Sequence, residues 1–422
     1  MSFRIALSGF NASATDLSVT GNNIANAGTT GFKESRAEFA DVYASSVLDR
    51  SASAAGQGVR VARIAQQFSQ GVVEFTSNNL DLAINGEGFF ALKDTSGSQV
   101  YTRAGAFSAD REGYVVNQAA QRLQVYPATT AADGTTVFNT GLRTDLQLPT
   151  QPSPPAATTE IYAALNLNAE EQVPPPFDPA LPGSYNHSSS IVTYDSLGNS
   201  HTATMYFRRT DVATNTWDVY VAVDGVFDDG TLAPAIPGAA SLSLAFDTSG
   251  ALTSPAPPDG LVVDVGPYDV GSGADPILLD FRFGDTTQYG GSFAVNSLGQ
   301  DGYSSGRLSG VDIDADGIVF ARYTNGQSSA IGKVALAKFN NAQGLRQIGD
   351  TSWVETFTSG DAQLGEAGTS SFGAIQSGAL EASTVDIAEQ LVNLITAQRN
   401  FQANAQVITA ADAITQTVIN LR

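Results

Sequence analysis

The sequence predicts an α+β, multidomain protein: terminal α-helices pair as a coiled-coil-like inner layer, and two nested, mainly antiparallel all-β domains lie between them in the chain. Three observations predict this fold class. The last forty residues repeat apolar side chains in steps of three and four, and the first residues do the same. The long stretch between them alternates apolar and polar residues with a period of two, between Asn-Gly and Asp-Gly turn signals.

The C-terminal stripe predicts one long helix over 383–422. No glycine or proline interrupts residues 385–420, and the spacing of Ser383 and Asp386 is typical of a capping box at a helix start. A helix of this length cannot bury an apolar stripe against itself, so it needs a partner. The stripe consists of Leu394, Ala397, Phe401, Asn404, Ile408, Ala411, Thr415 and Val418, with Ile387 and Leu391 extending the same face upstream.

The first residues supply a candidate partner. We expect this N-terminal helix to end within residues 22–28, because Asn26 and Gly28 favour leaving the α region. Two ordinary amphipathic helices packed on a globular core would show the same pattern. Their position at both extreme ends favours, instead, helices that pair with each other and with other copies of the chain. The members of this stripe are Phe3, Leu7, Phe10, Ala14, Leu17, Gly21 and Ile24.

Composition restricts the function. The 422 residues carry a formal net charge of −21, from 42 acidic and 21 basic side chains. Nucleic acid is therefore not an expected partner, because binding to phosphates needs a basic surface. The absence of cysteine excludes disulfides, thiolate metal ligands and a cysteine nucleophile. No apolar run is long enough to span a membrane, and the N-terminus lacks the basic leader and apolar block of a cleaved signal peptide.

The order of the segments predicts nested domains, because similar segments recur on either side of the centre. Prolines crowd into the centre, where the only Lys or Arg residues are Arg208, Arg209 and Arg282. We expect a terminal helical domain over 1–30 and 383–422, a connector over 31–72 and 373–382, an inner β domain over 73–148 and 297–372, and an inserted outer β domain over 149–296. The most strand-like runs are 190–194, 202–207, 217–223, 241–246, 260–265, 277–283, 307–313, 317–323, 331–339 and 353–357.

Two segments resemble chemical sites. The carboxylates from Asp312 to Asp316 match the opening of a calcium loop, but Tyr323 stands where the closing glutamate belongs, so a hairpin turn is favoured. Residues 302–306 match the Gly-x-Ser-x-Gly pattern of hydrolases, but no histidine lies downstream to act as a base. The only histidines are His187 and His201. We therefore assign no catalytic, metal-binding or cofactor-binding residue, and we do not expect an enzyme.

Motifs near both ends of the chain identify a family. Residues 22–26 and 30–33 resemble the N-terminal signature of the flagellar rod and hook proteins of bacteria. Residues 82–90 and 101–107 are similar to the next two motifs of that family, and residues 377–383, 391–395 and 398–404 are similar to its C-terminal motif. The resemblance covers residues 1–148 and 297–422. Its N-terminal motif residues are Asn22, Asn23, Asn26, Gly31, Phe32 and Lys33.

The resemblance implies a tubular homopolymer in the extracellular flagellar hook, exported by the flagellar type III apparatus, that joins the rod to the filament as a universal joint. It also implies contact with the distal rod protein, the hook cap protein, the hook-length control protein and the hook–filament junction proteins. The length of the chain favours a hook protein over the shorter rod proteins. The alternatives are a distal rod protein or, in a different class, a secreted β-rich enzyme or adhesin.

The last predicted helix also has a polar side without charge. Gln398, Gln402 and Gln406 are spaced to lie along one side of it. Simple solvation explains such a face. The alternative is that these amides face the channel of the tube that the family resemblance implies, where they would hydrate well without holding charged chains that pass.

Overall fold

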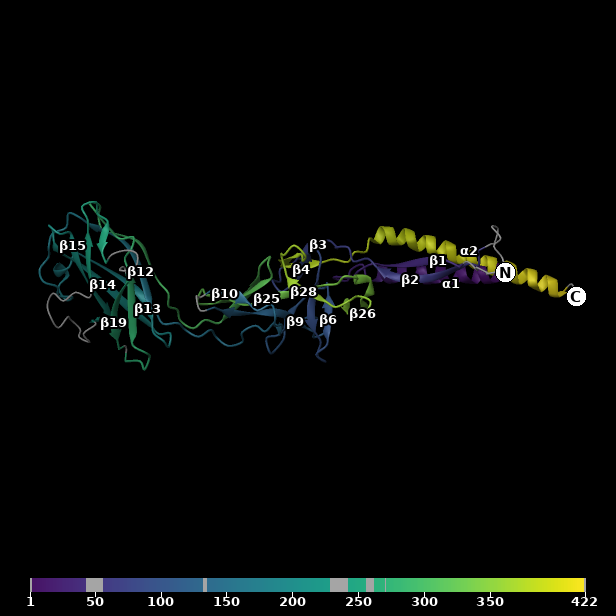
Figure 1. Cartoon of the computed structure of the whole chain (residues 1–422), viewed down its shortest axis with the longest axis horizontal. Helices are drawn as coiled ribbons and strands as arrows, with labels where there is room; N and C mark the ends of the chain where they lie inside the picture. Colours follow the sequence, from purple (N-terminus) through teal and green to yellow (C-terminus); the bar gives the residue numbers. More distant parts are fainter. Residues whose placement is uncertain are drawn as a thin grey trace. The chain divides into compact units, whose positions relative to one another are not determined.

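The computed structural model describes residues 2–42, 56–131, 135–227, 242–255, 262–269 and 271–420 (Figure 1). The chain divides into two units. The first contains Met1–Thr150, Ser309–Arg322 and Ser328–Arg422, and the second contains Gln151–Leu308 and Tyr323–Gln327. The second unit begins at Gln151, where the inserted domain was predicted from 149, and the chain returns to the first unit at Ser309, where the predicted end was 296.

Two long helices stand at the ends of the chain, in the first unit. They are α1 (Ser2–Ala25) and α2 (Ile387–Asn420), and they run antiparallel, with both termini at the same end of the pair (Figure 1). The end of α1 agrees with the sequence. The start of α2 does not, because Asp386 and not Ser383 caps the helix. The Asp386 Oδ1 atom accepts hydrogen bonds from the backbone N–H groups of Ala388 and Glu389 at 2.8 and 3.2 Å.

A β-hairpin covers one side of α1. It pairs β1 (Ser35–Asp41) with β2 (Val59–Gln66) in an antiparallel register, with a bulge between Glu38 and Phe39. Ala37 and Ala65 are buried in it, and Ser8 of α1 accepts a hydrogen bond from the Val59 N–H at 3.2 Å. The sequence predicts only a connector over 31–72. This prediction missed both strands, because short alternating runs such as 35–41 contain few large apolar residues.

The remaining strands of the first unit bring distant parts of the chain together in nested pairs. Small ladders join β3 (Val73–Phe75) to β30 (Ala379–Glu381), and β4 (Leu82–Asn85) to β29 (Ala374–Ser377). The larger sheet contains β5 (Phe89–Lys93), β6 (Gln99–Thr102), β7 (Ser108–Ala109), β8 (Val115–Val116), β9 (Arg122–Thr130), β10 (Thr136–Phe138), β11 (Thr144–Asp145), β23 (Leu308–Ile313), β24 (Ile318–Tyr323), β25 (Ser328–Lys338), β26 (Arg346–Gly349), β27 (Ser352–Val354) and β28 (Gln363–Glu366). The 3₁₀ turn η2 (Ala342–Gly344) lies between β25 and β26.

Aromatic rings fill the core of this sheet. Phe89 lies 5.7 Å from Trp353 and 5.9 Å from Phe339, both edge-on, and the three side chains are at most 5% exposed. One predicted strand is too long: β27 ends at Val354, and Phe357 lies in the turn that follows, with its side chain fully exposed.

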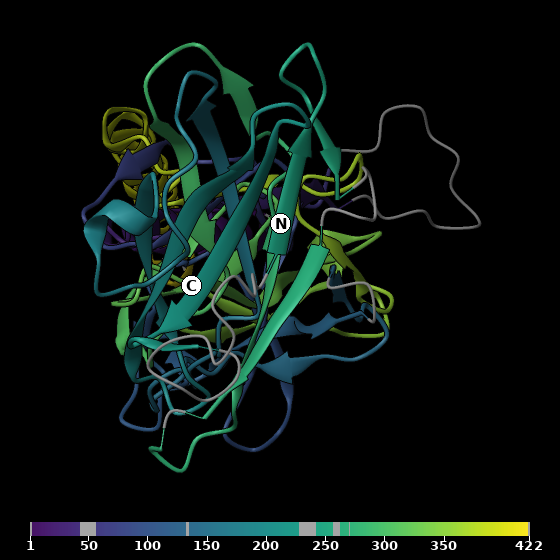
Figure 2. The same cartoon turned by 90° about the vertical axis from the view of Figure 1, so that its left-hand side faces the viewer.

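The second unit is a β-sandwich (Figure 2). One sheet contains β12 (Glu160–Asn168), β19 (Val262–Tyr268), β20 (Ile277–Arg282), β21 (Thr287–Tyr289) and β22 (Ala294–Gln300). The other contains β13 (His187–Tyr194), β14 (Ser200–Asp211), β15 (Thr216–Val223), β16 (Val226–Phe227), β17 (Leu242–Phe246) and β18 (Leu252–Ser254). Side chains from both sheets, among them Leu165, Phe207, Trp217 and Phe281, share one core and are fully buried. Pairing is antiparallel except where β12 runs parallel to β20 and β21.

The proline-rich segment before β13 covers part of the second sheet and includes the 3₁₀ turn η1 (Pro182–Ser184). Phe177 stacks on Tyr220 with 3.8 Å between ring centroids, in an aromatic cluster beside the main core. Arg209 is buried and donates hydrogen bonds to the carbonyl oxygens of Ala169 and Glu171 at 2.6 and 2.8 Å. The proline-rich segment is therefore held in an ordered conformation against the sheet by ring stacking and hydrogen bonds.

Candidate functional site

The two terminal helices meet along a seam of mixed polarity. The rings of Phe10 and Phe401 lie 4.3 Å apart, and Asn404 Nδ2 donates a hydrogen bond to Ser13 Oγ at 3.3 Å. Gly9 lets the helices approach closely, because a Cβ atom there would lie 2.7 Å from Asn404 Oδ1. A side chain at position 9 would displace the amide of Asn404 from its place in the seam.

The predicted stripe of α2 faces this seam over most of its length. Ala397 is buried, and Leu394, Phe401, Asn404, Ile408 and Ala411 are half-buried. The residues between them are exposed, except Ala405, which is also half-buried. Upstream the buried seam departs from the predicted stripe, and the assembly role predicted for Ile387 and Leu391 stays a prediction. The seam continues through Gln390, which is 2% exposed, while Ile387 and Leu391 are 54% and 46% exposed. Thr415 is exposed, and the side chain of Val418 lies outside the described part of the chain.

The predicted stripe of α1 is displaced from the face that the structure buries. The most buried residues are small or polar: Ala6, Ala12, Ser13, Val19, Thr20 and Asn23. Of the predicted stripe, Phe10, Ala14, Leu17 and Ile24 are half-buried, and Phe3, Leu7 and Gly21 are exposed. The reason is that α1 has two neighbours, α2 and the β1–β2 hairpin, so its covered face is wider than the seam of a simple helix pair. The role of these residues in assembly stays a prediction.

Asn23, from the N-terminal motif, holds the helices to the hairpin. Its amide pairs with the backbone of Ser35, accepting from the N–H at 3.0 Å and donating to the carbonyl oxygen at 2.7 Å. Asn23 Nδ2 also donates to Gln390 Oε1 at 3.2 Å, and Gln390 Nε2 donates to Glu34 Oε1 at 2.8 Å. Asn23 and Gln390 are both at most 2% exposed, so this polar network replaces apolar packing at the base of the helix pair.

A buried ion cluster ties both ends of the chain to the β-strands of the first unit. Lys33 Nζ lies 2.6 Å from Glu381 Oε1, and Arg103 Nη1 lies 3.3 Å from Glu381 Oε2, with side-chain exposures of at most 5%. Lys33 Nζ also donates to the Ser69 carbonyl at 2.6 Å, and Arg103 Nη2 donates to the Gly86 carbonyl at 2.9 Å. One carboxylate therefore holds two cations from distant segments.

Electrostatics make this cluster costly to break. Burial lowers the pKa of Lys33 and of Arg103, although the charge of Glu381 acts in the opposite direction on both. The Arg103 guanidinium also lies 5.5 Å from the centre of the Phe89 ring. A buried charge that loses its partner is strongly destabilising, so the cluster fixes where the terminal segments leave the β-strands.

The other motif residues pack beside this cluster. Gly31 has φ of +69°, and a Cβ atom there would lie 2.5 Å from the backbone N of Ala104. Its N–H donates to the Glu381 carbonyl at 2.8 Å. Phe32 is 6% exposed. The N-terminal motif, the motif around Arg103 and the C-terminal motif around Glu381 therefore meet at one place, although sequence analysis assigned no role to Arg103 or Glu381.

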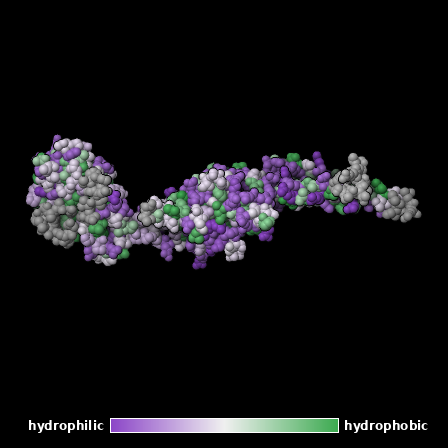
Figure 3. Space-filling view, in the orientation of Figure 1, coloured by the Kyte–Doolittle hydropathy of each residue, from purple (hydrophilic) through white to green (hydrophobic). Residues whose placement is uncertain are grey.

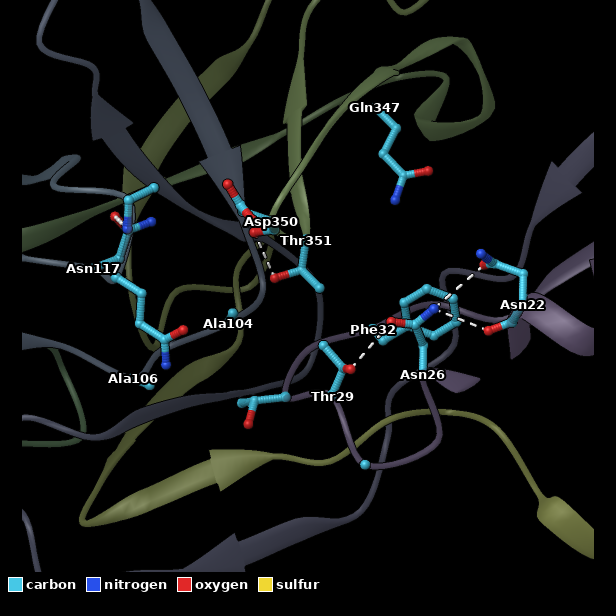
Figure 4. A pocket seen from close by; sticks show the side chains of 14 residues that line it. Asn22, Asn26, Thr29, Phe32, Ala104, Ala106, Asn117, Gln347, Asp350 and Thr351 are labelled. Carbon is cyan, nitrogen blue, oxygen red and sulfur yellow. Dashed lines mark hydrogen bonds between the residues drawn. The ribbon is translucent and has the colours of Figure 1, made fainter. Parts of the chain in front are cut away.

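A polar groove of about 700 Å³ lies beside the end of α1 (Figure 4). Asn26 Nδ2 donates to the Asn22 carbonyl at 2.9 Å, and Thr29 Oγ1 donates to Asn26 Oδ1 at 3.2 Å. Across the groove, Asp350 and Thr351 adopt left-handed backbone conformations, with φ of +48° and +49°. The lining offers amides and hydroxyls: it includes Asn22, Asn26, Thr29, Thr30, Asn117, Gln118 and Gln347.

The segments that resemble chemical sites have structural roles. Asp314 and Gly317 form the turn between β23 and β24, where Asp314 Oδ1 accepts from the Ile318 N–H at 2.7 Å. Residues 302–306 form a loop before β23. In the described part of the chain, no group of three or more His, Asp or Glu side chains gathers as metal ligands would. Neither described helix is long and apolar enough to cross a membrane.

The two histidines lie in the second unit beside carboxylates. His201 Nδ1 lies 2.7 Å from Asp224 Oδ2, and its Nε2 lies 3.4 Å from Asp195 Oδ2. Burial opposes the charged imidazole, but the hydrogen bonds to both aspartates outweigh it and raise the pKa of His201. For His187, burial outweighs the attraction of Glu171 and lowers the pKa.

Gln398, Gln402 and Gln406 are all exposed on α2, away from the seam. Figure 3 shows that hydrophobic residues, in green, also reach the surface around the terminal helices. Large exposed apolar residues on α2 include Ile387, Leu391, Val392, Ile395, Val407 and Ile414. The helix pair thus has a covered seam and an outer surface that mixes amides with apolar side chains.

Comparison with known families defines the class of this protein. Four family models match successive segments: flagella basal body rod protein at residues 3–33, flagellar hook protein FlgE/F/G D1 domain at 83–161, flagellar basal body protein FlaE D2 domain at 166–303, and flagellar basal body rod FlgEFG protein C-terminal at 376–421. These are the segments of flagellar rod and hook proteins.

Individual relatives show which kind of flagellar rod or hook protein this chain resembles. The chain is 38% identical to the flagellar hook protein FlgE of Escherichia coli and 39% identical to that of Salmonella typhimurium, with each alignment covering all of both chains. A crystal structure of the Helicobacter pylori flagellar hook protein FlgE2 matches 73% of this chain and all of its own, with a TM-score of 0.52 at 14% identity, which supports the fold. The chain belongs to the flagellar hook protein family, and it is a structural subunit of the hook.

Proposed function

We propose that the chain assembles into a flexible tube that transmits torque from the flagellar rod to the filament as a universal joint. One observation carries the proposal. The helix pair at the chain ends leaves large apolar side chains uncovered, such as Leu391 at 46% and Ile395 at 50%, whereas the β-strands of both units have filled cores. Apolar helix surface of this kind favours burial against other copies.

The terminal helices form the inner wall of this tube, and the second unit forms its outer part. A joint that turns while curved must let each row of subunits shorten and lengthen in every revolution. That motion needs a firm wall and weak, hydrated contacts further out. The second unit fits the outer role because its fold is complete within one chain. Gln398, Gln402 and Gln406 border the channel in this arrangement.

We also infer, from the family resemblance, the partners of the subunit and its export route. The hook subunit contacts the distal rod protein, the hook cap protein, the hook-length control protein and the hook–filament junction proteins. It leaves the cell through the flagellar type III apparatus and acts outside the cell as a structural protein.

Electron microscopy of the purified chain under polymerising conditions tests the function. We expect curved tubes. Straight, stiff polymers would favour a distal rod protein instead, and a chain that stays monomeric at every concentration would contradict the proposal.

Removing the second unit tests its outer role. A variant that lacks 151–308, joined by a short glycine-serine linker, should still form tubes, with altered curvature or stiffness. Loss of all assembly, in a variant whose remaining strands stay folded by circular dichroism, would contradict the layered arrangement.

A further inference from the structure

The side chain of Phe357 is fully exposed, in the turn between β27 and β28. The next most exposed large apolar side chain in the described part of the chain is Phe75, at 79%. A fully exposed aromatic ring forgoes the free energy that burial of its apolar surface provides. Covering the ring against a partner recovers that free energy, and most of it is kept if the ring is presented in a fixed orientation.

Hydrogen bonds on both sides of Phe357 fix this turn. The hydroxyls of Thr356 and Thr358 both donate to the Gly344 carbonyl, at 2.6 and 3.3 Å. The hydroxyl of Ser359, which is 1% exposed, accepts from the Thr356 N–H and donates to the Thr356 carbonyl, each at 2.8 Å. Gly344 allows this close contact, because a Cβ atom there would lie 2.5 Å from the Ser359 N. The ring therefore projects from a fixed turn.

A groove of about 250 Å³ lies in the same unit, between the end of β2 and η2. Its apolar lining consists of Ile64, Phe68, Ala342 and Leu345. The Phe68 ring meets the buried Trp353 ring edge-on at 5.7 Å, so the groove lies beside the aromatic core of the larger sheet. A ring from another molecule would find both aliphatic and aromatic contacts there.

Amide side chains hold the rim of the groove in place. Gln66 Oε1 accepts from Trp353 Nε1 at 2.7 Å, and Gln66 Nε2 donates to Gln347 Oε1 at 2.9 Å. The Gln343 amide donates to the Gln66 carbonyl. The groove is thus formed within a single chain. Phe357 of the same chain does not fill it, because its ring is fully exposed.

We propose that the Phe357 ring of one copy inserts into this groove on a neighbouring copy. The inference rests on the proposed function, since it names a contact of the polymer outside the terminal helices. Charge favours a second copy as the occupant. Neither the lining of the groove nor residues 356–360 contain a charged side chain, on a chain with a net charge of −21. Copies of so acidic a chain repel one another, so an uncharged turn and an uncharged groove are suited to meet.

Photocrosslinking of copolymers tests the contact directly. The photoreactive amino acid p-benzoylphenylalanine replaces Phe357 in an unlabelled chain and so keeps an aromatic ring. This chain is copolymerised with an excess of the wild-type chain labelled with heavy nitrogen, irradiated and digested. We expect mass spectrometry to find the unlabelled peptide around 357 joined to labelled peptides that contain 64–68 or 342–347. Because the two peptides come from differently labelled chains, this product reports a contact between copies.

The same photoreactive residue at position 75 is the matched control, because Phe75 is also exposed but belongs to neither the turn nor the groove. We expect this control not to label the groove peptides. Labelling of the groove at equal yield from both positions would overturn the proposal. Products that join 357 to a different surface, products confined to unlabelled peptides, or no product from the polymer would also overturn it.

A double-mutant cycle measures the coupling between the ring and the groove. We expect Phe357→Ala to raise the concentration of free chain in equilibrium with polymer by about tenfold or more. Ile64→Ala should raise it by a smaller factor. In the double variant Phe357→Ala/Ile64→Ala the two factors should not multiply, because residues in contact share one interaction. In Phe357→Ala/Phe75→Ala the factors should multiply.

Factors that multiply in both double variants would rule out the contact. If the wild-type chain polymerises and Phe357→Ala polymerises equally well, the ring contact is wrong and the proposed function stands. If the wild-type chain itself never forms polymer, the proposed function fails, and the ring contact fails with it.

Discussion

In the second unit, Trp217 and Phe281 are fully buried, whereas in the terminal helices Leu391 and Ile395 keep about half of their surface exposed. Both regions come from sequences in which apolar residues recur at short intervals. The difference is that two sheets can enclose a core between them, while two helices enclose only a seam. The sandwich is complete in one chain, and the helix pair is not. This contrast predicts that stability resides in the β-strands and that assembly resides in the helices.

The largest expected effect is loss of polymerisation from a charge in the seam. Phe401→Asp removes the ring contact with Phe10 and places a carboxylate between the helices. Complete burial of such a ring contributes about 1.5–3 kcal/mol. Phe401 is half-buried in the single chain, so the substitution loses part of this amount there, and a tube repeats the loss in every subunit. We expect no polymer by sedimentation and an unchanged thermal transition of the second unit. Phe401→Leu, which keeps an apolar side chain, should still assemble. Polymers of normal yield from Phe401→Asp would show that assembly does not depend on the seam.

Hydrogen exchange in the dilute monomer should show the same contrast. We expect amides of β14 and β15 to be protected by a factor of the order of 10³ or more, as in a stable domain core. Amides of α2, above all those of residues 412–417, should exchange far faster, and polymerisation should slow them. Equal protection of α2 and β14 in the monomer would mean that the helix pair needs no neighbour.

The buried ion cluster allows a test within the first unit. Glu381→Gln leaves Lys33 and Arg103 buried without their anion, and we expect a loss of about 3–5 kcal/mol in the free energy of unfolding of the first unit. The unfolding of the second unit should not change. Glu87→Gln is the matched control, because it removes the same charge from an exposed ion pair with Lys338. We expect the control to cost about 0–1 kcal/mol. Equal losses from the two variants would contradict the role of the cluster.

The smallest effect concerns pH and the second unit. The pKa of His201 is raised in the folded state, so its interaction with Asp224 and Asp195 stabilises the unit fully below the unfolded value of about 6.5. This stabilisation is lost as pH rises through the folded pKa. His201→Gln should remove that part of the pH dependence of the melting temperature. It should also weaken the dependence in the acid range, because His201 helps to hold the pKa of Asp195 and of Asp224 below its usual value. If the melting temperature of His201→Gln depended on pH as that of the wild type does, the stabilising role of His201 would be refuted.

Local signals in the sequence were sufficient for several elements. The turn at Asp314–Gly317 and the end of α1 near Asn26 agree with the structure, because turn and helix-end preferences act over a few residues. Most of the strands predicted from the sequence are present, from β13 to β27. Strands β12 and β22 were missed, and so were β1 and β2. Strand β12 alternates apolar and polar residues and meets the criterion for a strand, whereas β1 and β22 contain few large apolar residues.

The sequence by itself determined that two amphipathic helices stand at the ends of a mainly β chain, since periodicity is a local property of the residues. It did not determine which faces meet. The covered face of α1 depends on the β1–β2 hairpin, and the seam of α2 passes through Gln390 because Asn23 and Glu34 satisfy its amide. Lys33 and Glu381 are separated by 348 positions, so only the folded chain brings them together. Local propensity acts along the backbone, whereas burial and charge pairing act through space, and the tertiary structure decides both.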